Sequence, residues 1–247
     1  MRIFYDGLAR APRLDHPECV AVHPGDGSVW CGGEAGQLYR IAPDGSSCEE
    51  VASTGGFALG IAFSPGGELF VCDLVHKAVF RLSAAGELSV YASGFDTPNF
   101  PLFTPSGLFV SDSGAGTVVR LTPSRAIWYS GLTFPNGLAS DGRALYVAES
   151  FLPGISRIEI LPDGSAGARE VVVELPGVVP DGLAFGPDGL LHIACYEPSQ
   201  VLRLRDGSVE IVAHDPTAHL LCHPTNIAFS GSTAYVANLG RWHITEL

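Results

Sequence analysis

The chain has 247 residues and a formal net charge of −12, from 26 acidic and 14 basic residues. Gly (30) and Pro (18) make up about a fifth of it and charged residues only 16%, which excludes a disordered chain and disfavours long helices. Lys77 is the only lysine, so no basic surface can follow a nucleic-acid backbone. We therefore expect a globular, turn-rich β protein.

Six similar segments divide the chain, and they begin at Pro17, Ala58, Pro98, Pro135, Pro180 and Pro224. Each has a short apolar run, a turn rich in Pro, Asp and Gly, and a second apolar run, and most continue with a third and a fourth run. Such runs are typical of short strands joined by hairpins. Six units of four strands predict an all-β fold, a six-bladed β-propeller of four-stranded blades with residues 1–247 in a single domain.

The two ends of the chain are predicted to meet in the last blade. The unit that starts at Pro224 has room for three strands only. The N-terminal segment RIFYDG, residues 2–7, has the character of the missing outer strand. We expect it to pair with WHITEL, residues 242–247, because such pairing closes the ring and leaves no open seam.

Oxygen-bearing side chains stand at the start of the first strand in four of the six units. They are Glu18, Asn99, Asn136 and Asp181. First strands line the channel of a propeller, so these side chains should meet at one end of it, called the mouth below. Two carboxylates and two carboxamides suit a hard divalent cation, Ca²⁺ best, with Zn²⁺, Mn²⁺, Mg²⁺ or Fe²⁺ as further candidates. The alternative is that Asn136-Gly137 and Asp181-Gly182 are ordinary turn dipeptides.

A second set of polar residues ends the second strands and should return to the same mouth. It includes Asp73, Asp112, Glu149 and Asn238, with Tyr196 beside Cys195. An acid or amide at a strand end commonly bonds the backbone of the next turn, which is the structural alternative for Asp73, Asp112 and Asn238. Glu149 is a candidate proton acceptor, and Asp112 and Tyr196 are candidate substrate contacts. His16 and His223, just before first strands, are candidates for the rim of the pocket.

The motifs PEC with Glu18, PNF with Asn99, PNGL with Asn136 and PDGLAF with Asp181 resemble the SMP-30/gluconolactonase/LRE-like family over the whole chain. Paraoxonases and diisopropyl fluorophosphatase are related calcium propellers. The resemblance implies a divalent metal on Glu18, Asn136 and Asp181. It implies that Asn99 completes the metal shell or contacts substrate, and that Asp181 is the general base.

The sequence departs from the family's sugar lactonases beside the blade-three Asn. Those enzymes often have an Arg two residues before it and an Asp directly after it, where this chain has Thr97 and Phe100. We therefore expect a substrate less polar than an aldonolactone, with Phe100 in contact with it.

The favoured function is metal-dependent hydrolysis of a small-molecule lactone or ester, with Asp181 or Glu149 taking the proton of the attacking water. Hydrolysis of aryl esters or phosphotriesters, a condensation of the strictosidine-synthase kind, and a non-catalytic binding propeller of NHL type remain alternatives. No GxSxG, HExxH or P-loop motif occurs, so a nucleotide cofactor is unsupported. No apolar leader or membrane-spanning run and no CxxC pair is present, from which we expect a cytoplasmic protein with neither membrane nor nucleic-acid partners.

Overall fold

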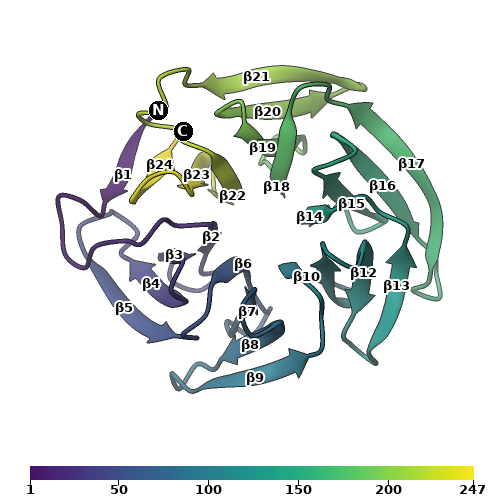
Figure 1. Ribbon diagram of the computed structural model, residues 1–247, viewed down its shortest axis with the longest axis horizontal. Helices are drawn as coiled ribbons and strands as arrows, with labels where there is room; N and C mark the ends of the chain where they lie inside the picture. Colours follow the sequence, from purple (N-terminus) through teal and green to yellow (C-terminus); the bar gives the residue numbers. More distant parts are fainter.

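The computed structural model describes residues 1–247, which form six four-stranded antiparallel sheets around a central channel (Figure 1). The predicted six-bladed β-propeller is confirmed. In each of the first five blades the strands follow one another outward from the channel in sequence order. The structure contains no helix that is long and apolar enough to cross a membrane.

The first five blades use the strands from Cys19 to His214. Blade one has β2 (Cys19–Val22), β3 (Val29–Gly32), β4 (Gln37–Ile41) and β5 (Cys48–Ser53), and blade two has β6 (Ala58–Phe63), β7 (Leu69–Asp73), β8 (Ala78–Leu82) and β9 (Leu88–Ser93). Blade three has β10 (Pro98–Thr104), β11 (Gly107–Asp112), β12 (Thr117–Arg120) and β13 (Ala126–Ser130). Blade four has β14 (Pro135–Ser140), β15 (Ala144–Glu149), β16 (Gly154–Ile160) and β17 (Ala166–Glu174), and blade five has β18 (Val179–Phe185), β19 (Leu191–Glu197), β20 (Gln200–Arg205) and β21 (Ser208–His214).

Blade six joins the two ends of the chain. It contains β22 (Pro224–Ser230), β23 (Thr233–Asn238) and β24 (His243–Glu246), and the N-terminal β1 (Arg2–Asp6) is its outermost strand. Arg2 lies opposite Glu246, and their side chains form an ion pair at 2.9 Å. Tyr5 is 1% exposed and packs in a core cluster that spans blades six and one. The predicted closure by the N-terminal strand is confirmed.

The hydrophobic core lies between neighbouring blades. One cluster packs Trp30 and Leu38 of blade one against Val71 and Phe80 of blade two. Each blade is therefore held by apolar packing on both faces, while the outermost strands, such as β9, are largely exposed. This arrangement fixes the first strands around the channel, and the candidate site is built on them.

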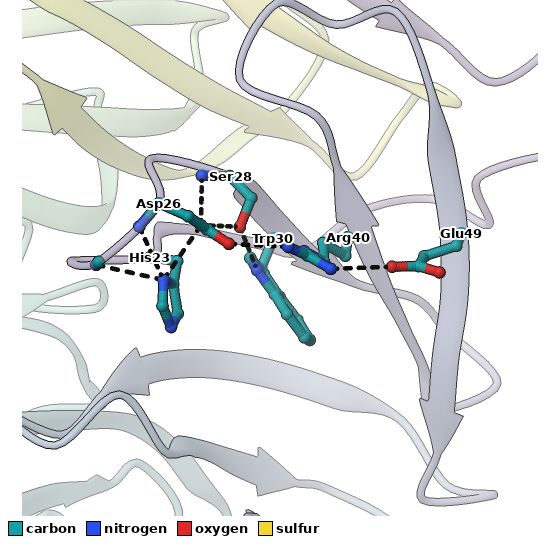
Figure 2. A network of polar contacts seen from close by, with 7 residues as sticks. His23, Asp26, Ser28, Trp30, Arg40 and Glu49 are labelled. Carbon is teal, nitrogen blue, oxygen red and sulfur yellow. Dashed lines mark hydrogen bonds and ion pairs between the residues drawn. The ribbon is translucent and has the colours of Figure 1, made fainter. Parts of the chain in front are cut away.

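A polar network ties the hairpin of blade one to its outer strands, at the end of β2 opposite Glu18 (Figure 2). The Asp26 carboxylate accepts hydrogen bonds from the Ser28 backbone at 2.9 Å and hydroxyl at 2.6 Å, and from Arg40 at 2.7 Å. The Ser28 hydroxyl in turn accepts the Trp30 indole N–H at 2.9 Å. Ser28 first, and then Arg40, hold the pKa of Asp26 well below its ordinary value. This network serves the fold and lies away from the mouth.

Candidate metal centre

Irregular pairing sets the candidate ligands apart from the β-ladders. Between β14 and β15, Pro135 faces Glu149 and the next paired residue, Leu138, faces Val147, so Asn136 is left out of the ladder. The ladders of β10 and β18 skip the residues after Pro98 and Pro180 in the same way. Such bulges re-aim side chains and are frequent beside functional sites. They leave Asn99, Asn136 and Asp181 free to turn toward the channel.

The glycines after two of these residues serve close packing of neighbouring strands. A Cβ atom on Gly137 would lie 2.4 Å from the backbone oxygen of Asp181, and one on Gly182 would lie 2.6 Å from that of Thr225. Both glycines lie inside strands, β14 and β18. The alternative of ordinary turn dipeptides is therefore wrong for Asn136-Gly137 and Asp181-Gly182. Only glycine lets the first strands approach this closely around the mouth.

The four oxygen-bearing residues are buried, and two carboxyl groups act on one another. Glu18, Asn99, Asn136 and Asp181 are only 7–9% exposed. Burial raises the pKa of Glu18 well above its ordinary value, and the nearby charge of Asp181 raises it further. Burial also raises the pKa of Asp181, with the Asn136 amide acting in the opposite direction. The carboxyl groups of Glu18 and Asp181 and the amide of Asn136 therefore lie close enough to interact, in an oxygen-rich site.

The residues present fit a divalent cation. The Oε2 atom of Glu18 is buried and has no hydrogen-bond partner. A buried, unpartnered carboxylate oxygen is costly unless a cation or a donor satisfies it. The set offers oxygen donors only, as Ca²⁺ prefers, and carries two formal negative charges to balance the ion. Glu18, Asn99, Asn136 and Asp181 would hold it.

Glu149 is buried and forms an ion pair with the partly exposed Arg169 of the same blade. Its side chain is fully buried. One oxygen accepts the backbone N–H of Thr133 at 2.7 Å, and the other accepts the Arg169 guanidinium at 2.5 Å and the Ser156 hydroxyl. These bonds tie the segment before β14 to β16 and β17. A carboxylate so fully occupied is suited to holding the blade together rather than to accepting a proton from water.

Asp112 also bonds backbone groups. Its two oxygens accept the N–H groups of Asp96 at 2.9 Å and Thr97 at 2.7 Å, which orders the segment that leads to Asn99. Asn238 makes the equivalent bond in blade six, where its Oδ1 accepts the N–H of Cys222, whereas Asp73 accepts the N–H of His76 in the turn after β7. All three residues therefore bond backbone groups, Asp73 in the next turn as the structural alternative predicts, and Asp112 and Asn238 in the segment before the first strand of their blade.

Tyr196 and the two candidate rim histidines each pack against an aromatic ring. The ring of Tyr196 stacks on His223, with centroids 4.4 Å apart. Burial raises the pKa of Tyr196, and the charges of Glu18, Glu197 and Asp181 raise it further. His16 packs on Trp242 at 4.6 Å and forms a cluster with Asp15 and Glu34, whose carboxylates lie 3.3 and 3.5 Å from its Nδ1.

Phe100 is placed inside the channel. It is 8% exposed and lines a cavity of about 530 Å³ formed by the later residues of the first strands. Asn226 lines the same cavity, is 3% exposed and has an unpartnered Oδ1 atom. Asn226 was not among the residues predicted from the sequence, although it follows Thr225 at the position that Gly137 and Gly182 hold in other units.

The family described as SMP-30/Gluconolactonase/LRE-like region matches residues 95–238, which include Asn99, Asn136 and Asp181. The chain belongs to this family. Protein STRICTOSIDINE SYNTHASE-LIKE 6 of Arabidopsis thaliana is 31% identical, over 77% of this chain and 58% of its own length. The chain thus spans little more than half of that relative.

Solved structures share the propeller fold with this family member. A gluconolactonase from Xanthomonas campestris is 19% identical, with a TM-score of 0.81 over 99% of this chain and 89% of its own. A putative gluconolactonase is also 19% identical, with a TM-score of 0.82 over 99% of this chain and 91% of its own. At such low identity the likeness concerns the fold.

Proposed function

We propose that the chain is a divalent-metal-dependent hydrolase that opens a lactone, a cyclic ester, at the mouth of the propeller. The observation that carries the proposal is the buried group of Glu18, Asn99, Asn136 and Asp181, in which Glu18 Oε2 has no partner. Membership of the SMP-30/gluconolactonase/LRE-like family supports a lactonase-type hydrolase in general. The all-oxygen donor set favours Ca²⁺ among the divalent ions.

The residues of the mouth have distinct roles in this proposal. A bound divalent cation supplies Lewis-acid polarisation of the ester carbonyl and makes a bound water more acidic. Asp181 accepts the proton of the water that attacks the carbonyl carbon, and returns it to the ring oxygen when the C–O bond breaks. Asn99 and Asn136 orient the ester beside it. The product is the open-chain hydroxy acid.

The structure around Asp181 suits this role. Its carboxyl is 7% exposed, and burial raises its pKa. A buried, more basic carboxylate is a better proton acceptor than a solvated one. Ser150 keeps Asn136 in place, because the Asn136 amide donates to Ser150 Oγ at 3.3 Å while the Ser150 hydroxyl donates to the Pro180 carbonyl at 2.7 Å. Both residues are thereby fixed to the strand that carries Asp181.

The direct test is a panel of lactones, aryl esters and phosphotriesters, each assayed with Ca²⁺, Zn²⁺, Mn²⁺ or Mg²⁺ and after exhaustive chelation. We expect lactone hydrolysis that chelation abolishes and the cation restores. Turnover of phosphotriesters or aryl esters alone would move the assignment to those classes. Full activity after chelation would refute the metal dependence.

Variants separate the site from the scaffold. Asp181→Asn should remove turnover with the fold intact, and Glu18→Gln should remove cation binding in calorimetry. Glu87→Gln, an exposed acid in the turn before β9, is the matched control and should change neither. A wild-type protein that binds no divalent cation and turns over no member of the panel would favour a non-catalytic binding propeller.

A further inference from the structure

Two large apolar side chains are exposed at the mouth itself. Val75 is 64% exposed and Phe151 66% exposed. Each lies two residues after the end of a second strand, β7 at Asp73 and β15 at Glu149. The other exposed large apolar residues lie on outermost strands or in the N-terminal segment. Val75 and Phe151 are therefore unusual in where they are exposed.

Further aromatic residues stand behind these two side chains. Phe134, two residues before Asn136, stacks on Phe151 with centroids 4.4 Å apart and an angle of 28° between the rings. Phe134 holds a positive φ of 57°, a conformation that is costly for an aromatic residue and that its neighbours must impose. In blade two, Phe57 lies two residues before Leu59, and its carbonyl accepts the N–H of Leu74 at 3.0 Å, next to Val75.

We call the set of Phe57, Leu59, Val75, Phe134 and Phe151 the apolar arc. It comes from blades two and four, on either side of Asn99 in blade three. Blade three contributes only the neutral Thr97 and the small Gly114 at the corresponding positions. Two charged residues of the same region, Lys77 and Asp96, form an ion pair at 3.3 Å.

The opposite side of the mouth, from blades five, six and one, is acidic. Asp15, Glu34 and Glu197 lie there, and so do the carboxylate ligands Glu18 and Asp181. The two amides, Asn99 and Asn136, belong to blades three and four, beside the apolar arc. The mouth is thus divided into an anionic half, suited to a cation, and an apolar half with amide donors at its inner edge.

We propose that the apolar arc binds an alkyl or aryl substituent of the substrate, so that the enzyme prefers substituted, apolar lactones or esters to polyhydroxylated sugar lactones. This inference rests on the proposed function of the mouth as a hydrolytic site. The hydroxyl groups of a sugar lactone would lie against Val75 and Phe151 without partners, which opposes binding. An alkyl chain would cover the exposed Phe151 ring and remove apolar surface from water.

The test compares δ-valerolactone with δ-lactones that bear pentyl or heptyl chains, and with glucono-δ-lactone, in the calcium-loaded protein. We expect kcat/KM to rise about three- to fourfold for each methylene that reaches the arc, mainly through KM. Phe151→Ala and Val75→Ser should flatten this dependence, lowering kcat/KM for the pentyl- and heptyl-substituted lactones far more than for δ-valerolactone. Ile127→Ala, an equally exposed apolar residue on β13, is the matched control and should leave the dependence intact. Faster turnover of glucono-δ-lactone, or an unchanged dependence in Phe151→Ala, would overturn the inference.

A binding measurement separates this inference from the proposed function. Calorimetry with δ-valerolactam and its pentyl-substituted analogue needs no turnover. Tighter binding of the substituted lactam that is lost in Phe151→Ala supports the arc even where no lactone is hydrolysed. Equal binding of the two lactams contradicts it. Loss of binding in Phe229→Ala instead would place the ligand in the 530 Å³ channel cavity and would also contradict it.

Discussion

The hydroxyl of Thr225 donates a 2.6 Å hydrogen bond to the backbone carbonyl of Glu18, 207 residues away in the chain. Thr225 is the second residue of the first strand of blade six, and Glu18 immediately precedes the first strand of blade one. Both residues are buried. The bond therefore fixes the Glu18 backbone at the seam where the ring closes, and it links closure of the propeller to the geometry of the candidate metal centre.

Replacing Thr225 tests this link. Thr225→Val keeps the size of the side chain but leaves the Glu18 carbonyl without its donor, which should cost about 1–2 kcal/mol of unfolding free energy. We also expect weaker Ca²⁺ binding, because the backbone that carries the Glu18 carboxylate is less well held. Urea unfolding and calorimetry measure the two effects. Thr225→Ser keeps the hydroxyl and should restore both, and unaltered Ca²⁺ affinity in Thr225→Val would contradict the positioning role.

The crowding of Glu18 and Asp181 predicts opposite stability effects with and without cation. In chelator, Glu18→Gln should raise the melting temperature, because it removes a buried charge that lies beside a second one. With Ca²⁺ at a hundred times its dissociation constant, the wild type should gain about 2.7 kcal/mol by linkage. The variant should gain almost nothing. Melting curves that keep the same order in both buffers would rule out this explanation.

The repeat in the sequence was sufficient to predict the architecture. Segments such as ALGIAF and PDGLAF alternate with turns so regularly that the six blades and the N-terminal closing strand followed from strand counting. The irregular strand pairing around Asn136 and Asp181 could not be predicted from the sequence repeat. The dipeptide Asn-Gly is also common in turns, so the sequence alone does not distinguish a turn from a strand at this position. Only the close approach of β18 shows that Gly137 is needed for packing.

The sequence predicted some residues of the candidate site and not others. Glu18, Asn99, Asn136 and Asp181 share a position in the repeat, so sequence alone grouped them. Glu149 occupies an equally regular position, but its partner Arg169 lies on β17, where the repeat gives no signal for it. The apolar arc was also missed, because it combines the starts of first strands with the ends of second strands. A set of this kind can be recognised only when the structure shows that the starts of first strands and the ends of second strands lie at the same mouth.

The hydrogen bonds of Asp215 predict how the free energy of unfolding depends on pH. Burial acts to raise its pKa, but hydrogen bonds from Thr217, Leu220 and Leu221 outweigh it and hold the pKa well below the ordinary value. A carboxylate with a lowered folded-state pKa stabilises the fold above its unfolded pKa of about 3.9. That stability is lost as the pH falls through the folded-state pKa.

We therefore expect Asp215→Asn to cost about 2 kcal/mol at pH 7, since several hydrogen bonds to an ionised group are weakened. The difference between variant and wild type should shrink below about pH 4, because the carboxylate then takes up protons in the unfolded wild-type chain while it stays ionised in the folded one. Urea unfolding at a series of pH values measures this. A difference that stays constant down to pH 2 would show that the charge of Asp215 contributes nothing.

The ion pair between the buried Glu149 and Arg169 allows a structural role of Glu149 to be distinguished from a catalytic one. Arg169→Met should destabilise the protein by about 3–5 kcal/mol, because it leaves the Glu149 carboxylate buried without its cation. Glu149→Gln in the Arg169→Met background should recover much of that lost stability. Glu149→Gln alone should lower the melting temperature and leave the turnover number close to that of the wild type. A proton acceptor would behave in the opposite way, with turnover lower by a factor of about 10²–10⁴ and stability nearly unchanged. Measuring kcat and unfolding free energy on the same preparations decides between the two, because only the structural role couples the effect at Glu149 to the side chain at position 169.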